Sequence, residues 1–385
     1  MTPVSRPVPR LLVTTALVVA TACVAVPRLV LPPPASGAPT APGPSPRSRT
    51  FDPAALNARC EGCHKEIAAE WQASSHREAY TDVTYQRQLA HEPAAFCNSC
   101  HAPEAAATGP VPEPLGRLGV GCVTCHVVGD KVLAAPAGEA TDRPATHDGE
   151  SHPLTRTADF TKDTACASCH EFPFPDSRPR GAPLLMQSTI TEHAASAYAD
   201  HSCASCHMPR KPGGKGGSHR DHTFSASRDE ALLRSAILVE ERPLEGDTLT
   251  LVLRPGRVGH AFPTGDMLRR LAFTLEVVDA EGTVVQKETR YLARHFGLSR
   301  APNMPSRRRL LKDDRVGAHT GPVVLRHTLR RPPAGGTIHY VLRYERISDP
   351  RGGPENRPEL EGSVVLAEKT LPLSGSTALD DVERR

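Results

Sequence analysis

Cys60-Glu61-Gly62-Cys63-His64 is the first of five copies of the pattern Cys-x-x-Cys-His, and this repeat decides the fold. The pattern is the attachment signature of c-type haem. Its spacing has a chemical reason, because each thiol adds to one vinyl group of the porphyrin while the adjacent His reaches the iron. The sequence therefore predicts five covalently bound haems. In motif order, the attachment cysteines are Cys60 and Cys63, Cys97 and Cys100, Cys122 and Cys125, Cys166 and Cys169, and Cys203 and Cys206, and the iron ligands are His64, His101, His126, His170 and His207.

Other uses of the cysteines are disfavoured. Cys-x-x-Cys also occurs in zinc sites and thiol redox centres, but five matches that all end in His leave little room for either. A disulfide framework is disfavoured too, because only Cys23 lies outside the motifs. The composition agrees: aromatic residues make up 4% of the chain, too few for an ordinary apolar core of this size. The formal net charge of +3 is too balanced to indicate a nucleic-acid partner.

The amino terminus has the charge order of an export signal. Arg6 and Arg10 precede an apolar run over residues 11–26, and Arg28 follows it. We expect a signal peptide or an amino-terminal membrane anchor over residues 1–31 and a Pro-rich linker over residues 32–50. Cys23 is either a lipid acceptor or a small residue of the leader. A periplasmic or other extracytoplasmic location follows, with membrane attachment through the anchor.

The rest of the chain divides by pattern into two domains. All five motifs lie in residues 51–225, hereafter the motif segment, where we expect stacked porphyrins to replace an apolar core among short helices and irregular segments. Helices are expected over residues 65–76, 82–90 and 183–200. Residues 226–385 alternate apolar and polar side chains, as at Leu249, Leu251 and Leu253, which is typical of half-buried strands. The predicted fold class is α+β, a haem-packed domain followed by a β-sandwich.

Two groups of strings resemble a known family. Cys60 to Ile67, followed by Trp71-Gln-Ala-Ser-Ser-His76, resembles the opening of the multihaem cytochrome c family that includes the tetrahaem cytochrome c of ammonia oxidisers. The string from Cys203 to Pro209 and the string from Gly259 to Gly265 are similar to segments of exported multihaem cytochromes with a carboxy-terminal sandwich domain. The resemblance covers most of residues 55–290. It implies that His76 is a distal iron ligand and that His222 is one as well.

Thirteen histidines remain for the sixth position of five irons. His260 is a candidate because Gly259 permits close approach of the backbone to a haem. We expect His295, His319, His327 and His339 to lie at the surface or beside an iron ligand, without binding iron themselves. Met186 and Met267 are the methionines that could serve instead, whereas Met208 directly follows a proximal His and cannot reach the opposite face. The candidate distal ligands are His76, His152, His193, His222 and His260, with His147, His201 and His219 as alternatives for His152 and His193.

The expected function is electron transfer. An iron held by two histidines has no open position and can only exchange electrons. The pentahaem nitrite reductases resemble the chain in haem number, but their catalytic haem has Lys in place of the proximal His, and all five motifs here end in His. The hydroxylamine-oxidising enzymes cross-link a haem to Tyr, and nothing marks a Tyr for that role. The alternative is a reductase or oxidase of a small nitrogen or sulfur compound at one five-coordinate haem. A third hypothesis is a subunit of a larger redox complex.

The predicted partners are redox proteins that act as donor and acceptor. One basic stretch bears on them: ten Lys or Arg lie between Arg294 and Arg331, against Asp313 and Asp314. It is either a docking patch for an acidic redox partner or anionic lipids, or a solvated loop between strands. We favour the solvated loop.

Overall fold

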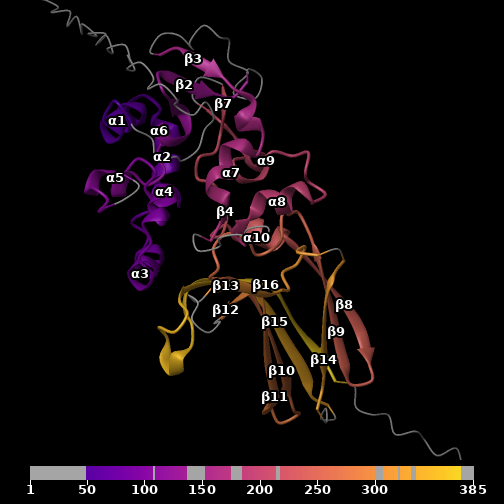
Figure 1. Ribbon diagram of the computed structural model, residues 1–385. Coiled ribbons are helices and arrows are strands. Elements are labelled where there is room, and N and C mark those ends of the chain that lie inside the picture. The colour runs from indigo at the N-terminus through magenta and orange to yellow at the C-terminus, as the bar shows by residue number, and fades with distance from the viewer. Residues whose placement is uncertain are drawn as a thin grey trace, which may run out of the picture.

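The computed structural model describes residues 49–106, 109–136, 152–174, 184–213, 217–299, 307–319, 321–330 and 335–373. The predicted leader, most of the Pro-rich linker, Cys23 and His147 lie outside these ranges. Among the described residues, the helices are all too short or too polar to cross a membrane. The fold is α+β, as predicted, with the motif helices in the upper half of Figure 1 and the long strands in the lower half.

Each motif lies on a turn of helix or directly at its end. A helical turn brings residues three positions apart to the same side, which is where the two thiols of one motif have to be. The amino-terminal end of the first helix is stabilised in two ways. The Asp52 carboxylate accepts hydrogen bonds from the first-turn amides of Ala54 and Ala55, and Pro53 occupies the first helical position. The helices of this part are α1 (Pro53–Cys63), α2 (Lys65–Gln72), α3 (Val83–His91), η1 (Ala95–Cys97), α4 (Asn98–His101), α5 (Glu113–Leu118), α6 (Cys122–His126), η3 (Ala158–Thr161), α7 (Thr164–His170), α8 (Thr189–Ala194) and α9 (Cys203–His207).

The motif segment also contains short strands, which the expectation of a helical or irregular segment missed. They form a three-stranded sheet in the order β1-β2-β3 and two hairpins, β4-β5 and β6-β7. The helix expected over residues 183–200 is confirmed only over Thr189–Ala194. Residues 185–188 pair with the strand that follows the fourth motif, and residues 195–200 form turns. The strands are β1 (Val127–Val128), β2 (Lys131–Ala134), β3 (Leu154–Arg156), β4 (Glu171–Pro173), β5 (Leu185–Ser188), β6 (Arg210–Pro212) and β7 (Ser218–Arg220).

The carboxy-terminal part is a β-sandwich of two antiparallel sheets, as predicted. One sheet has the order β11-β10-β15-β16 and the other β14-β9-β8, and a helix, α10 (Glu230–Ser235), precedes them. Leu251 and Phe273 come from different sheets and both are fully buried in the shared core. The strands are β8 (Ile237–Glu245), β9 (Thr248–Pro255), β10 (Arg269–Val278), β11 (Val284–Leu292), β12 (Arg294–Ser299), β13 (Arg307–Asp313), β14 (Val323–Thr328), β15 (Thr337–Asp349) and β16 (Glu359–Pro372), with a turn of helix, η5 (Pro354–Asn356), before the last.

The two parts differ in how much apolar core they hold. The sandwich core draws large side chains from both sheets. In the motif segment the described apolar cluster is small and comprises Leu56, Trp71, Leu118, Val123 and Val127. So small a cluster cannot stabilise a segment of this length by burial of side chains alone. The contrast is what the sequence predicted for a segment packed around cofactors.

The sandwich is fastened to the motif segment at separate places. Hairpin β12-β13 reaches β5, where the Arg294 guanidinium donates hydrogen bonds to the backbone carbonyls of Leu185 and Met186 at 2.8 and 2.9 Å. Phe296 of the same hairpin meets Phe174 edge to face, with ring centroids 5.2 Å apart. Helix α3 contacts the far end of β15, where Gln88 donates to the carbonyl of Ser348. The loop between β9 and β10 makes a further contact with α8, described below.

Candidate haem-binding site

Four of the five motif histidines face a histidine from elsewhere in the chain. The four ring-centroid distances fall between 6.2 and 6.4 Å, and each pair combines one motif residue with one residue outside the motifs. The partners in each case are residues that the sequence analysis named as candidate distal ligands. The pairs are His64 with His152, His76 with His170, His126 with His222, and His207 with His260.

These spacings fit one metal ion between each pair of rings. A ring nitrogen binds a transition metal at about 2 Å and lies about 1 Å from its ring centroid, so two imidazoles on opposite sides of one metal have centroids about 6 Å apart. Direct ring stacking does not explain the pairs, because the angle between the ring planes ranges from 14° to 64° while the distance barely changes. The residues present therefore fit an iron ligated by two histidines.

Hydrogen bonds at the other ring nitrogen orient several of these rings. The Nδ1 atoms of His126, His207, His222 and His260 lie 2.9, 2.7, 2.7 and 3.1 Å from the backbone carbonyl oxygens of Leu133, Ser225, Arg220 and Ala261. A carbonyl accepts only from an N–H, so Nδ1 carries the proton in each ring. Nε2 then keeps its lone pair, which is the arrangement that metal-ligating histidines use.

Desolvation favours the neutral form of several of the paired rings. It lowers the pKa of His76 to about 3 and the pKa values of His170, His222 and His260 to about 4. A neutral imidazole is the form that can bind a metal. The pair of His64 and His152 gives a further indication of a bound metal. Nδ1 of His152 is buried and has no hydrogen-bond partner among the described residues. A buried ring nitrogen without a protein partner is costly unless another group binds it.

His76 follows α2 and is held in place by its backbone and by one aromatic ring. Its carbonyl oxygen accepts a hydrogen bond of 2.9 Å from the Val120 amide. The preceding Gly119 has a φ of +56°, and a Cβ there would lie 2.5 Å from the same carbonyl oxygen. On the other side, the Phe224 ring meets His76 edge to face at 4.2 Å. Phe224 itself has a φ of +51°, an uncommon backbone conformation for an aromatic residue.

Phe224 also contacts His222, with ring centroids 5.7 Å apart. The His222 backbone amide donates to the Glu70 carboxylate of α2 at 2.9 Å, and His219 approaches the same carboxylate at 3.0 Å. Hairpin β6-β7 is therefore anchored to α2 through Glu70, and this anchor places His222 opposite His126. The sequence analysis missed Glu70 and Phe224, because neither residue type signals a role beside a metal site.

His193 does not face a motif histidine. Its Nδ1 lies 2.9 Å from the Asp163 carboxylate, which also accepts a hydrogen bond from the Cys203 thiol. The close approach that Gly259 permits is to the His193 ring, 2.9 Å from where a Cβ would stand. Of the two described alternatives, His219 pairs with Glu70 as above and His201 lies against Tyr198 at a ring-centroid distance of 5.4 Å. The structure brings neither of them opposite a motif histidine.

The histidines expected at the surface or beside an iron ligand pair with acceptors of the sandwich. His295 and His339 lie 3.0 Å from the carboxylates of Asp314 and Glu368, and His319 lies 2.8 Å from a backbone carbonyl. For His327 the surface position is wrong, because its ring is buried against Phe273 in the sandwich core.

His101 of the second motif has no histidine opposite it among the described residues. Its Nδ1 lies 2.6 Å from the carbonyl oxygen of Ala79, and the Tyr85 ring stacks on it at 3.8 Å. Burial lowers the pKa of His101, while the nearby carboxylates of Asp82 and Asp266 oppose that effect. Its Nε2 is thus available to an iron like the others. What differs is the absence of a second imidazole from the described surroundings.

The thiols show which motifs are neighbours. Cys100 and Cys169 interact directly, which lowers the pKa of Cys100 to about 7. Cys166 and Cys203 also interact directly, and this raises the pKa of Cys203 well above its ordinary value. The fourth motif therefore lies between the second and the fifth. A weaker electrostatic effect of Cys60 on the pKa of Cys122 places the first motif near the third.

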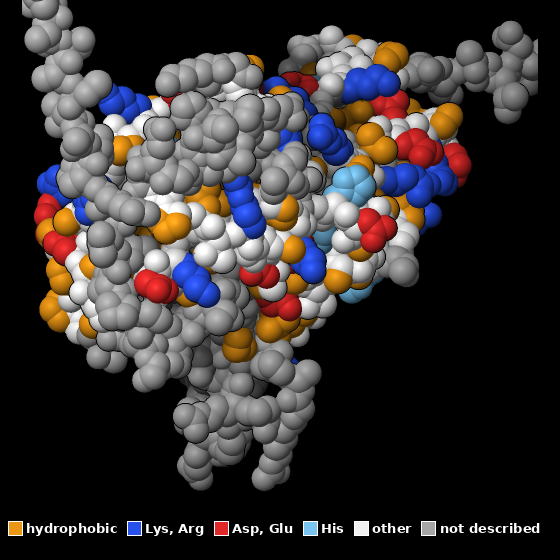
Figure 2. Space-filling model, turned by 90° about the horizontal axis from the view of Figure 1, so that it is seen from above, with side chains coloured by type: hydrophobic (Ala, Val, Ile, Leu, Met, Phe, Trp, Pro, Cys, Tyr) orange, Lys and Arg blue, Asp and Glu red, His pale blue; other side chains and the backbone are white. Residues whose placement is uncertain are grey.

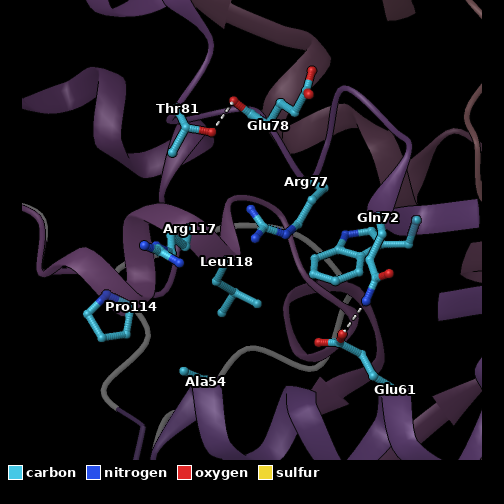
Figure 3. Close-up of a pocket in the computed structure, with 10 residues that line it drawn as sticks. Ala54, Glu61, Gln72, Arg77, Glu78, Thr81, Pro114, Arg117 and Leu118 are labelled. Atoms are coloured by element: carbon cyan, nitrogen blue, oxygen red, sulfur yellow. Dashed lines mark hydrogen bonds between the residues drawn. The ribbon is translucent and has the colours of Figure 1, made fainter. Parts of the chain in front are cut away.

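A hollow of about 530 Å³ lies between α1, α2 and α5, apart from the paired rings (Figure 3). Figure 3 shows the guanidinium groups of Arg77 and Arg117 reaching into it from different segments, and Arg77 lies 5.6 Å from the Trp71 ring. Glu61 and Glu78 also line it. The two charges of each sign balance, so the hollow does not favour an ion of either sign.

The basic stretch is used partly inside the molecule. Arg294 donates to β5 as described, Arg308 pairs with Glu92, and the buried Arg315 pairs with Glu192 of α8. These three side chains thus join the sandwich to the motif segment. Neither the docking-patch hypothesis nor the solvated-loop hypothesis predicted this role. On the face seen in Figure 2, described Lys and Arg side chains lie beside Asp and Glu, without a large patch of one sign.

Two comparisons with known proteins bear on the family and on the fold. Residues 59–127, which hold the first three motifs, match the family described as cytochrome c554 and c-prime. The part of the chain that holds the first three motifs is therefore similar to a family of multihaem c-type cytochromes. The fold of the chain is similar to that of a penta-heme cytochrome c552 from Thermochromatium tepidum, with a TM-score of 0.58 and 19% sequence identity over 82% of this chain and 97% of that chain. No curated protein matches the chain. The family match over residues 59–127 supports covalently bound haem c and a haem-based electron-transfer role.

Proposed function

We propose that the protein is an exported pentahaem cytochrome that passes electrons along a series of covalently bound haems. The observation that carries the proposal is the set of four histidine pairs at 6.2 to 6.4 Å, which supports four irons with both axial positions filled by protein. Such irons have no position for a substrate. Two observations support export. The predicted leader has the charge order of an export signal. In addition, multihaem c-type cytochromes are typically extracytoplasmic.

The contacts between motifs support a connected series. The first and third motifs are neighbours, and the second, fourth and fifth motifs meet through their thiols. Cys125 and Cys169 influence each other electrostatically, which links the two groups. When bound, haem supplies an iron that gains and loses one electron at a time. The chain's own residues orient several of the paired rings through hydrogen bonds at Nδ1, which leaves Nε2 free to bind the iron.

A second candidate function is favoured by one observation: no histidine of the described ranges lies opposite His101. An iron held there by His101 alone would have an open position, and the protein would then be a reductase or oxidase of a small nitrogen or sulfur compound at the second motif. The third hypothesis, a subunit of a larger redox complex, has no comparable observation in its favour. Donor and acceptor proteins are part of the proposal in each case, and membrane attachment would come through the predicted anchor.

Electron paramagnetic resonance of the oxidised holoprotein separates the two candidates. A carrier gives low-spin signals only, and the reduced protein binds carbon monoxide poorly at every haem. An open iron gives one high-spin signal and one stoichiometric carbon monoxide complex.

The double variant Cys97→Ser and Cys100→Ser assigns any such signal, because it removes covalent attachment at the second motif alone. If the high-spin signal and carbon monoxide binding disappear with it, and the wild-type protein turns over nitrite, hydroxylamine or tetrathionate, the carrier proposal is wrong. A high-spin signal that survives in the double variant would instead place the open iron at another motif and remove the reason for the second candidate.

A further inference from the structure

Arg315 is almost completely buried at the contact between the sandwich and the motif segment, with 4% of its side chain exposed. Its guanidinium donates to both oxygens of Asp313, at 2.9 and 2.7 Å, and to the Glu192 carboxylate at 2.6 Å. The remaining nitrogen donates to the carbonyl oxygen of Pro263 at 3.1 Å. One side chain thus holds a strand end of the sandwich, helix α8 of the motif segment and the loop between β9 and β10.

Glu192 holds the same loop from the other side. Its carboxylate accepts hydrogen bonds from the Ala261 amide at 3.2 Å and from the Thr264 hydroxyl at 3.4 Å. Ser188, at the end of β5, donates to it at 2.6 Å and so fixes the carboxylate on its own segment. The residues held, Ala261, Pro263 and Thr264, directly follow His260 in the chain.

Other contacts also hold the loop: Phe262 is buried in the sandwich core against Tyr344, and the Thr264 hydroxyl lies 3.1 Å from that of Thr189. A two-residue bridge joins Phe262 to Val316, and Val316 is the residue after Arg315, so this bridge depends on the same segment. The Nδ1 atom of His260 bonds to the carbonyl oxygen of Ala261, within the loop itself. The direction of the His260 ring therefore follows from where the loop is held. A buried ion pair is a costly way to gain stability but an effective way to fix a geometry.

We propose that Glu192 and Arg315 are positioning residues that hold His260 opposite His207, at the ring-centroid distance of 6.2 Å observed here. The inference rests on the proposed function, in which His260 ligates the iron of the fifth haem. It adds that the sixth ligand of this haem depends on an ion pair between the two parts of the molecule. Loss of the pair releases the ligand without touching either histidine or any attachment cysteine.

The test compares holoproteins that each carry five haems by pyridine haemochrome assay. Glu192→Gln keeps the size of the side chain and removes its charge, which leaves Arg315 buried with Asp313 alone. We expect it to convert a fraction of one iron from low spin to high spin, and to add carbon monoxide binding at that iron in the reduced protein. His260→Ala should convert the same iron completely, and added imidazole should restore its low-spin signal. Arg315→Lys keeps the charge and should give an effect smaller than that of Glu192→Gln.

Glu345→Gln is the matched control. Glu345 pairs with Arg270 at 2.7 Å within the sandwich, and both side chains are largely buried, so the substitution breaks a comparable pair that does not touch the loop. Its spectra should equal those of the wild type. A high-spin signal in this control as well would show general loosening and overturn the inference.

Two outcomes separate the inference from the proposal beneath it. If His260→Ala converts one iron while Glu192→Gln and Arg315→Lys leave the spectra unchanged, His260 is a ligand but the ion pair does not position it. If His260→Ala itself leaves every spectrum unchanged, His260 is not a ligand, and both the assignment and the inference fail. If Glu192→Gln does not retain five haems, the spectra of Arg315→Lys and of the Glu345→Gln control test the inference by the same criteria.

Discussion

His193 is a candidate distal ligand that the fold places beside a carboxylate and not opposite a motif histidine. It lies on α8, 7% of the residue is exposed, and its ring is bound to Asp163 and not placed opposite a motif histidine. We expect His193→Gln to retain five haems and the low-spin signals of the wild type, because Gln can still donate to Asp163. Paramagnetic resonance of the oxidised protein measures this directly.

His222→Ala is the comparison for that variant, since His222 faces His126 at 6.3 Å and its removal should expose one iron to carbon monoxide. A spin change in His193→Gln with none in His222→Ala would mean that the structure pairs the wrong rings.

At this scale the sequence predicts the attachment chemistry and part of the axial ligands. The motif cysteines follow from spacing alone. His76 and His222 follow from a family resemblance. His260 was predicted from Gly259, but the close approach that Gly259 permits is to the His193 ring. Glu70, Phe224, Glu192 and Arg315 could not be predicted, because each acts through a partner far away in the chain that only folding brings near.

Among the elements, the strands of the sandwich were the most predictable. Alternation at Leu271, Phe273 and Leu275 identifies β10 directly, since the inward side chains are fully buried. Strand β5 was not predictable, because its pairing with β4 is a tertiary contact that overrides local preference. Among the α-helices of the motif segment that the structure describes, α1 and α3 have a side-chain cap, supplied by Asp52 and Asp82.

Removal of a core side chain from β9 should weaken the sandwich without changing the haems. Leu251 is fully buried between the sheets, so Leu251→Ala should lower the free energy of unfolding by about 2–5 kcal/mol through lost burial and the cavity left behind. Chemical denaturation followed by the fluorescence or circular dichroism of the strands measures the loss. The low-spin signals should stay as in the wild type, because Leu251 lies in the sheet away from the His260 loop. Altered haem spectra would mean that the sandwich core transmits strain to the fifth haem.

For the molecule as a whole, the first expectation is five haems per chain. The pyridine haemochrome assay on matured protein should give that stoichiometry, and the intact mass should exceed the mass of the polypeptide by five haems. Three or fewer haems in properly matured protein would contradict the proposed pentahaem series, because some motifs would then serve another purpose.

The second whole-molecule expectation concerns the chain without haem. The described apolar cluster of the motif segment is small, whereas the sandwich core joins two sheets. Protein produced without haem attachment should therefore lose residues 51–225 to limited proteolysis and keep a resistant core that begins near α10, identified by mass spectrometry. A resistant fragment that contains α1 to α9 would show that the polypeptide, and not the porphyrins, supplies the stability of that part.

The four histidine pairs have one more consequence, which concerns connectivity. The paired residues enclose the chain segments 64–152, 76–170, 126–222 and 207–260, and each of these segments overlaps the next. Iron bound between the rings of each pair would therefore cross-link the chain as interlaced disulfides do, and each loop closed in this way reduces the conformational freedom of the unfolded chain. The cross-linked segments between His64 and His260 could then not separate from one another without the breakage of an iron–nitrogen bond.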